Sequence, residues 1–350
     1  MKATYRKYIL DFKKPGGTSR GIMTRKETWF LLLEEGGRRG IGECGMFRGL
    51  SSDDVPGYED RLRLLCRQLE AGEAVPLKTL AAFPSIRFGL EQALLSFNSP
   101  DPFLLFPSAF TDGREPIPIN GLIWMGSKTF MLKQIRKKLE EGYQCIKLKI
   151  GSLDFGTELQ LLAAIRAEHP AAEIELRVDA NGAFSAEEAP EKLNRLSDFD
   201  LHSIEQPVKQ GQWDIMAALC ETSPVPIALD EELIGLFSVT EKTKLLQIIN
   251  PAYLVLKPSL LGGYSGCEEW LELVGKAGTG WWVTSALESN VGLNAIAQWT
   301  FGKAQKMAQG LGTGSLFKNN FHSPLTAAGG FLSYDTNTKW TNQIFKTLCT

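Results

Sequence analysis

Histidine is scarce in this chain, with only three histidines among 350 residues. His169, His202 and His322 share no spacing typical of metal ligands, so we expect them to be structural or surface residues. The six cysteines are scattered and form no CxxC pair. This pattern predicts reduced thiols in a cytoplasmic protein.

A large excess of charge of either sign is also absent, because the formal net charge is only −2. The balance indicates neither a nucleic-acid footprint nor a basic membrane face. The longest apolar stretches, such as residues 29–33 (WFLLL), are far too short to span a bilayer. Residues 1–14 carry charges but no apolar core, so we expect no signal peptide.

The glycine-rich stretch near the end of the strand repeat lacks the dinucleotide-binding motif. The glycine-rich stretch at 310–314 reads GLGTG and is followed by Ser315, so it is not GxGxxG. This departure argues against a dinucleotide site at 310–314.

The first part of the chain, residues 1–115, has the pattern of an α+β unit. Strand-like composition and helical periodicity predict strands at 2–12, 28–34 and 39–44 and helices at 58–70 and 85–97. Residues 99–118 are rich in proline and turn-forming residues. We therefore place a domain boundary near 113–116.

From residue 116 to 324, short apolar segments alternate with amphipathic helical ones. Such alternation predicts a parallel sheet with helices outside it. The strand candidates lie at 117–121, 145–150, 174–180, 201–207, 225–231, 252–258, 281–288 and, more weakly, 310–314. Eight strands fit a (β/α)8 barrel, with an open doubly wound sheet as the alternative. Residues 325–350 have no repeat to join and are expected to return to the N-terminal unit.

Acidic residues occupy the ends of three successive strand candidates. Asp179, Glu205 and Asp230 lie 26 and 25 residues apart, which is one β/α unit each. The C-terminal ends of barrel strands meet at one mouth, so the three carboxylates should converge there. A site made only of carboxylate oxygens suits Mg²⁺, or Mn²⁺ as a substitute, better than zinc.

Lysines flank these acids at neighbouring strand ends. Strand alternation places Lys147 and Lys149 on one face. Two ammonium groups in a partly dry site should lower each other's pKa, and such a lysine can act as a general base. Lys257 ends the sixth candidate and would reach the mouth from the far side. Each of these lysines and acids alone could be a surface lysine, a helix cap or a strand end. The regular spacing of the whole set at successive strand ends indicates a functional site.

The chain resembles the enolase superfamily, in the muconate-lactonizing subgroup that carries a K-x-K motif. The matching strings are KLK (147–149), RVDANGAF (177–184), IEQP (204–207), ALDEE (228–232) and LKPSLLGG (256–263). The resemblance also covers the N-terminal unit, which corresponds to a capping domain. It implies that Asp179, Glu205 and Asp230 bind Mg²⁺. It also implies that Lys149 and Lys257 form an acid/base pair on opposite faces of the substrate, with Lys147 completing the catalytic set.

Residues 284–293 and 310–317 resemble segments of subgroup members that act in menaquinone synthesis. Those enzymes dehydrate a hydroxycyclohexadiene carboxylate that carries a succinyl chain. Lys149 would remove the α-proton and then help the β-hydroxyl leave. Racemisation of N-succinyl or other N-acylamino acids is the alternative, whereas 310–314 lacks the D-x-D of dipeptide epimerases. A third alternative is a non-catalytic barrel that binds Mg²⁺ or a small carboxylate.

The resemblance also suggests how a small carboxylate substrate would be held. The Gly-rich segments 13–26 and 45–54 are expected to be loops that close over the barrel mouth. Arg20, Arg25 or Arg48 would then meet the succinyl carboxylate, while Ser285 and Gly310 would bind it through their backbone N–H groups.

Overall fold

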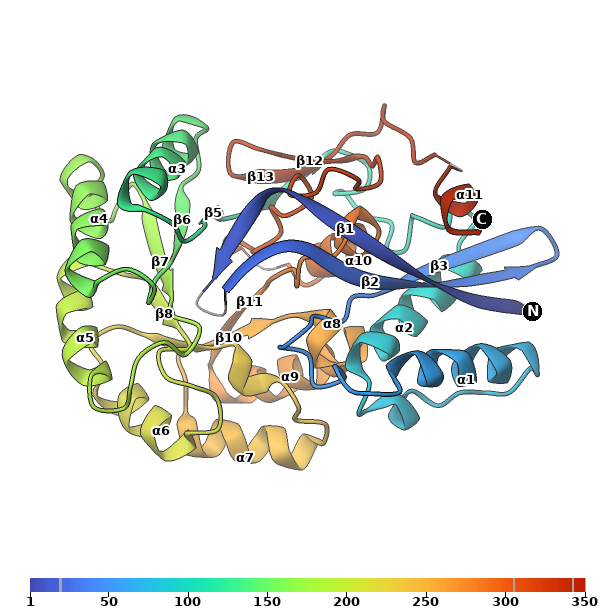
Figure 1. The fold of residues 1–350 in the computed structure, drawn as a ribbon, viewed down its shortest axis with the longest axis horizontal. Coiled ribbons are helices and arrows are strands. Elements are labelled where there is room, and N and C mark those ends of the chain that lie inside the picture. The colour runs from blue at the N-terminus through green and yellow to red at the C-terminus, as the bar shows by residue number, and fades with distance from the viewer. Residues whose placement is uncertain (19–20, 305, 342, 350) are drawn as a thin grey trace.

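The computed structural model describes residues 1–18, 21–304, 306–341 and 343–349. A three-stranded antiparallel sheet with two helices against it forms the N-terminal part, and a β/α repeat curls into a barrel beside it (Figure 1). The predicted fold, a (β/α)8-type barrel with an α+β cap, is confirmed.

The cap sheet has strands longer than the sequence predicts. Its strands are β1 (Lys2–Thr18), β2 (Gly21–Glu35) and β3 (Arg38–Cys44), in that order. The expectation of a loop over 13–26 is therefore wrong for the described residues, which belong to the β1–β2 hairpin. The pairing register shifts between Asp11 and Gly16, a stretch that contains Pro15. Proline has no N–H to donate, so the ladder is interrupted there rather than ended.

Two helices and a 3₁₀ turn cover one face of the cap sheet: α1 (Tyr58–Glu70), η1 (Leu77–Leu80) and α2 (Pro84–Asn98). Trp29, Leu31 and Leu33 alternate along β2 and pack into the core shared with α1 and α2. Helix α2 lies directly on β3 because glycines face each other. A Cβ on Gly42 would stand 1.9 Å from the carbonyl oxygen of Gly89.

Seven parallel strands form the barrel wall, each paired with the next along the chain (Figure 1). They are β5 (Gly121–Ile123), β6 (Cys145–Lys149), β7 (Glu175–Asp179), β8 (Ser203–Glu205), β9 (Ile227–Leu229), β10 (Tyr253–Leu256) and β11 (Gly280–Val283). The connecting helices and 3₁₀ turns are α3 (Lys128–Glu140), α4 (Phe155–Glu168), α5 (Ala189–Leu196), η2 (Ser197–Phe199), α6 (Trp213–Thr222), η3 (Glu231–Leu233), α7 (Val239–Ile249), α8 (Pro258–Leu261), α9 (Gly263–Ala277) and α10 (Asn290–Phe301).

The eighth strand is reduced to Gln309 and Gly310, which close the ring. They form parallel bridges to Ile119 on one side and Thr284 on the other. The Gly310 N–H donates to the Val283 carbonyl at 2.8 Å. The weak strand predicted at 310–314 is thus only a bridge.

The C-terminal segment contacts both parts of the molecule. Strands β12 (Leu325–Ala328) and β13 (Phe331–Tyr334) form a hairpin that pairs with β4 (Ile117–Pro118). The first barrel strand is therefore β5, later than the predicted 117–121. Helix α11 (Gln343–Cys349) packs on the cap sheet, where Phe345 joins a cluster with Phe30. The division into domains at 115 and 324 stays a prediction.

In the described part of the chain, no histidine or cysteine belongs to a group of side chains close enough to hold a metal ion. The His202 ring packs on Tyr253 with centroids 4.7 Å apart. The cysteines whose side chains the structure describes are all free: Cys44, Cys66, Cys145, Cys220 and Cys267. Among the described residues, none of the helices combines the length and the apolarity needed to cross a bilayer.

Candidate active site

The register of the barrel strands brings three carboxylates together. Asp179 ends β7, Glu205 ends β8 in register with it, and Asp230 follows β9. All three side chains are almost fully buried. One oxygen from each carboxylate can be chosen so that all lie within 4.8 Å of one another. The convergence expected from the 26- and 25-residue spacings is present.

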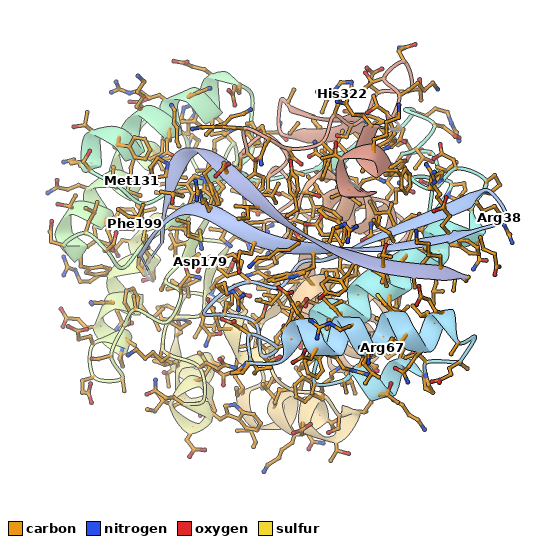
Figure 2. The ribbon with its side chains drawn as sticks, turned by 45° about the vertical axis from the view of Figure 1, so that its right-hand side comes forward. Arg38, Arg67, Met131, Asp179, Phe199 and His322 are labelled. Atoms are coloured by element: carbon orange, nitrogen blue, oxygen red, sulfur yellow. The ribbon has the colours of Figure 1, made fainter. Side chains whose placement is uncertain are left out.

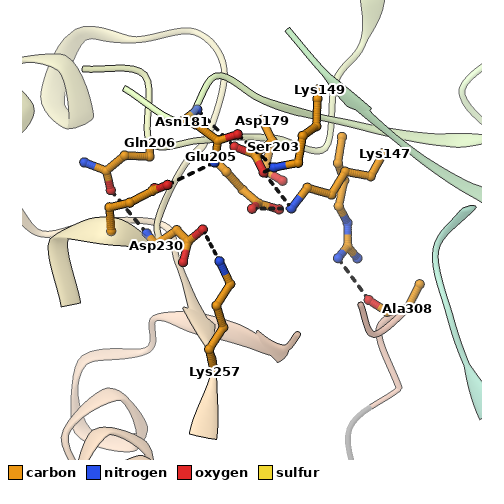
Figure 3. A network of polar contacts seen from close by, with 12 residues as sticks. Lys147, Lys149, Asp179, Asn181, Ser203, Glu205, Gln206, Asp230, Lys257 and Ala308 are labelled. Atoms are coloured by element: carbon orange, nitrogen blue, oxygen red, sulfur yellow. Dashed lines mark hydrogen bonds and ion pairs between the residues drawn. The ribbon is translucent and has the colours of Figure 1, made fainter. Parts of the chain in front are cut away.

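Three lysines surround this acidic cluster (Figure 3). Strand β6 turns Ile146 and Leu148 toward the helices, and Lys147 and Lys149 toward the carboxylates. The Lys149 Nζ lies 2.8 Å from Asp179, and Lys147 contacts both Asp179 and Glu205.

Lys257 approaches the cluster from the opposite side to Lys149 (Figure 3). Its Nζ donates to Asp230 Oδ2 at 2.5 Å. The cluster therefore has an ammonium group on each of two opposed sides, which is the arrangement an acid/base pair requires.

Burial and mutual repulsion act on the carboxylates unequally. The pKa of Glu205 is raised to about 7, first by its burial and then by the charges of Asp179 and Asp230, against the effect of Lys147. Burial would raise the pKa of Asp179 too, but Lys147 and Lys149 outweigh it and hold that pKa below its usual range. The cluster thus holds one acid that ionises poorly without more positive charge.

The expected lowering of the lysine pKa is wrong for Lys147. Burial alone would lower the pKa of Lys147, but the charges of Asp179 and Glu205 outweigh burial and raise it. The pKa of Lys257 is raised in the same way, mainly by Asp230 against its burial. The strand spacing predicts the repulsion between neighbouring lysines but not the strength of the carboxylates around them.

The donor set fits a hard divalent cation. Three carboxylates supply only oxygen ligands, and Glu205 Oε1 is buried without a hydrogen-bond partner among the described residues. Such an oxygen is costly unless a cation or donor meets it. Oxygen-only ligands are those that Mg²⁺ prefers, and it leaves positions for water or substrate.

Two amide side chains that the sequence argument gave no role hold the cluster in place. Asn181 Oδ1 accepts a hydrogen bond from Lys149 at 2.8 Å, and its backbone N–H donates to Asp179. Gln206 Oε1 accepts from the backbone N–H of Asp230 at 3.2 Å, which ties β8 to β9. Both have positive φ angles: Asn181, two residues after Asp179, has 46°, and Gln206, next to Glu205, has 39°. In the sequence, their positions in the strings DAN (179–181) and EQP (205–207), next to the predicted metal ligands, could have indicated this role.

A cavity of about 410 Å³ opens above the cluster and is closed in part by the cap. Lys149, Asp179 and Lys257 line its inner end, while Phe12 and Met23 of the β1–β2 hairpin line its outer wall. Figure 2 shows Asp179 in the interior of the molecule behind this hairpin. The cap thus contributes apolar wall, together with Lys13 and Lys14, to a site whose innermost charges come from the barrel.

Ser285 and Gly310 do line the cavity, but their backbone N–H groups are engaged. The Ser285 N–H donates to the Gly310 carbonyl at 3.1 Å, and the Gly310 N–H donates to Val283. Both bonds close the barrel. The predicted binding of a carboxylate through these N–H groups therefore does not hold in this structure.

The predicted arginines are not brought to the cavity wall in the described part of the chain. Arg25 pairs with Asp11 at 2.9 Å on the exposed side of the hairpin. Arg48 pairs with Glu27 and Asp54. Arg20 lies outside the described residues.

A second buried charge cluster lies where the cap meets the barrel, and the sequence argument did not find it. We call it the seam cluster: Lys26 of β2, Glu43 of β3 and Glu288 after β11, all buried. Glu288 accepts hydrogen bonds from Ser259 at 2.5 Å and Ser285 at 2.7 Å. Glu43 accepts four, two of them from Ser289 at the start of α10.

Comparison with known proteins places the chain in a family. The model of the family described as enolase C-terminal domain-like matches residues 131–337, which is more than half of the chain. The chain therefore belongs to the enolase superfamily, as its motifs predicted.

Particular relatives narrow the comparison. An o-succinylbenzoate synthase from Desulfotalea psychrophila is 48% identical over 363 aligned residues, covering 95% of this chain and 98% of that protein. The crystal structure of MenC from the same organism matches with a TM-score of 0.85 and 46% identity, covering 95% of this chain and 99% of that one. An N-succinylamino acid racemase from Amycolatopsis is more distant, at 27% identity over 95% of this chain and 91% of the racemase.

Proposed function

We propose that this chain is a Mg²⁺-dependent carbon–oxygen lyase of the menaquinone pathway. It would dehydrate 2-succinyl-6-hydroxy-2,4-cyclohexadiene-1-carboxylate to o-succinylbenzoate. The observation that carries the proposal is the pair of ammonium groups, Lys149 and Lys257, on opposed sides of a buried carboxylate cluster. The prediction of this activity from the motifs agrees with the relative at 48% identity.

Asp179, Glu205 and Asp230 would hold the metal ion. When bound, Mg²⁺ would supply positive charge to the carboxylate next to the carbon acid, and Mn²⁺, which also prefers oxygen ligands, would substitute for it. A cation there would also meet the unpartnered Glu205 Oε1 and compete with the ammonium groups for the carboxylate oxygens.

The chain's own residues then have separable tasks. Neutral Lys149 removes the α-proton of the ring, and the ammonium so formed returns that proton to the β-hydroxyl, which leaves as water. The ring gains a double bond and becomes aromatic, so hydrogen and hydroxyl are lost together as one water molecule. Lys257, as an ammonium, stabilises negative charge on the opposite side. Lys147 holds Asp179 and Glu205 in place.

A second candidate, racemisation of N-succinylamino acids, is favoured by the same opposed lysines. A racemase needs a base on each face of the α-carbon, and Lys149 and Lys257 could each serve one face. The Amycolatopsis racemase covers nearly the same length of this chain.

The experiment is turnover of the diene acid, followed by absorbance, for wild type and Lys149→Ala, each with Mg²⁺ and with EDTA. We expect dehydration only by wild type with Mg²⁺, with Lys149→Ala slower by about 10²–10⁴-fold, the usual contribution of a general base. Lys78→Ala, at an exposed cap lysine, is the matched control and should retain full activity.

Exchange of the α-proton of an N-succinylamino acid in D₂O measures the racemase activity separately. Exchange without dehydration would replace the first proposal by the second. Stabilisation by Mg²⁺ without either reaction would indicate a non-catalytic barrel.

A further inference from the structure

The second carboxylate of the proposed substrate needs a partner that the predicted residues do not provide. The backbone N–H groups of Ser285 and Gly310 close the barrel. The Ser285 hydroxyl is also engaged, since it donates to Glu288 and accepts from Thr313 at 2.9 Å. Another part of the cavity must therefore meet the charge at the end of the succinyl chain.

The cavity wall is strongly basic although the whole chain is slightly acidic. Among the residues that line it, the only carboxylate is Asp179, and the cations are Lys13, Lys14, Lys137, Lys138, Lys147, Lys149 and Lys257. The last three are committed to the buried acids. Lys138 pairs with Glu141 at 2.9 Å and lies over the Tyr143 ring.

Lys13 and Lys14 differ from the others because neither has an ion-pair partner within the described residues. Both are exposed, on the part of β1 that borders the outer end of the cavity. Lys137 of α3 is also exposed, and its contact with Glu141 is long, at 3.6 Å. The cavity thus has buried, paired lysines at its inner end and exposed lysines at its outer end.

The backbone beneath Lys13 and Lys14 is held against the barrel. The Lys13 N–H donates to the Leu316 carbonyl at 2.8 Å, and Phe12 bridges Phe317. Farther along, Gly17 lies so close to the barrel that a Cβ would stand 2.6 Å from the Met125 carbonyl oxygen. The hairpin reaches across the barrel strands (Figure 1), and its lysines are presented from a fixed position.

We propose that Lys13 and Lys14, with Lys137, form a cationic rim that binds the second carboxylate of a dianionic substrate. The inference rests on the proposed function, which supplies a substrate with two carboxylates. The inner cluster takes the carboxylate beside the reacting carbon, and the rim selects ligands whose chain ends in a second one. Because the rim is exposed, its attraction is screened by salt and acts on binding rather than on the chemical step.

The test compares two ligands on the Mg²⁺-loaded protein by calorimetry: o-succinylbenzoate and its monoamide, in which the succinyl carboxylate is a carboxamide. Wild type should bind the diacid roughly tenfold more tightly at low salt, since exposed ion pairs each contribute up to about fivefold. The double variant Lys13→Gln/Lys14→Gln should lose most of this preference, because only Lys137 of the rim remains. Lys244→Gln, at an exposed lysine of α7, should keep the wild-type preference.

In turnover, the double variant should raise KM with kcat unchanged, and the effect should shrink as salt is added. Undiminished discrimination in the double variant, or none in wild type, overturns the rim. Failure of the proposed function is distinct, because it appears as wild type that does not dehydrate the diene acid, whatever the ligand preference.

Discussion

The barrel cluster and the seam cluster both bury opposite charges, and their polar atoms are satisfied in different ways. In the barrel cluster, carboxylates crowd together and Glu205 Oε1 has no hydrogen-bond partner in the described structure. In the seam cluster, both oxygens of Glu43 and of Glu288 accept hydrogen bonds from serine, threonine or backbone donors. Buried carboxylates whose oxygens all accept hydrogen bonds hold structure, whereas an unpartnered carboxylate oxygen has capacity left for a cation. In the seam cluster the unpartnered atom is instead the Lys26 Nζ.

A glutamate-to-glutamine substitution in each cluster distinguishes a ligand-binding role from a structural one. We expect the largest effect, on catalytic activity, at Glu205. Glu205→Gln removes one carboxylate from the proposed metal site. We expect kcat/KM to fall by about 10³-fold, which corresponds to about 4 kcal/mol of lost charge stabilisation. Steady-state dehydration at saturating Mg²⁺ measures this.

The free energy of unfolding of Glu205→Gln should not fall, although the activity of this variant does. Burial raises the pKa of Glu205 to about 7, so the neutral amide costs less to bury than the carboxylate at neutral pH. Without Mg²⁺ the variant should therefore be at least as stable as wild type in urea, and Mg²⁺ should no longer raise its melting temperature. Activity within tenfold of wild type would mean that Glu205 is not a ligand.

Glu43→Gln is the matched change in the seam cluster. Four donors would lose a charged acceptor: the Thr28 hydroxyl, the Ser289 hydroxyl and the N–H groups of Ser289 and Gly292. We expect the free energy of unfolding to fall by about 2 kcal/mol, the usual value for hydrogen bonds to a charged group. Urea unfolding measures the loss, and kcat should change little.

Glu34→Gln controls for charge removal alone, because the Glu34–Arg39 pair is exposed and should contribute less than about 1 kcal/mol. If Glu43→Gln instead abolishes turnover while leaving stability intact, the division of roles between the two clusters is wrong.

The two clusters also differ in how far the sequence predicted them. The spacing of Asp179, Glu205 and Asp230 follows from the β/α repeat, and strand alternation alone orients Lys147 and Lys149. Both are local, periodic rules, so the barrel and its charged mouth could be predicted.

The seam cluster follows no local rule. Glu43 accepts from the N–H of Ser289, which is 246 positions away, and only the docking of cap and barrel brings them together. Segment 13–26 failed for a different reason. Its glycines and Pro15 are typical of a loop, but the β1–β2 pairing resumes beyond the register shift, at Gly16 and Met23, and residues 11–13 also pair with 316–318. The backbone N–H groups of Ser285 and Gly310 were predicted to bind substrate, but they form the hydrogen bonds that close the barrel. This closure, too, is visible only in the folded structure.

The smallest expected effect depends on pH and concerns Lys26. Its Nζ is buried without a hydrogen-bond partner in the described structure, and its charge opposes the rise that burial causes in the pKa of Glu288. In Lys26→Met the pKa of Glu288 should rise further. At pH values above 4.5, the ordinary glutamate pKa, ionising Glu288 in the folded state then costs more free energy than in wild type.

The destabilisation by Lys26→Met should therefore grow with pH, by about 1 kcal/mol between about pH 5 and about pH 8, since one pKa unit is about 1.4 kcal/mol. Urea unfolding at both pH values measures it. Adding Glu288→Gln should remove this pH dependence, because the Glu288 carboxylate is then no longer there to ionise. A loss that is equal at both pH values would show that Lys26 contributes packing alone, and the seam cluster would then be held by its hydrogen bonds rather than by its charges.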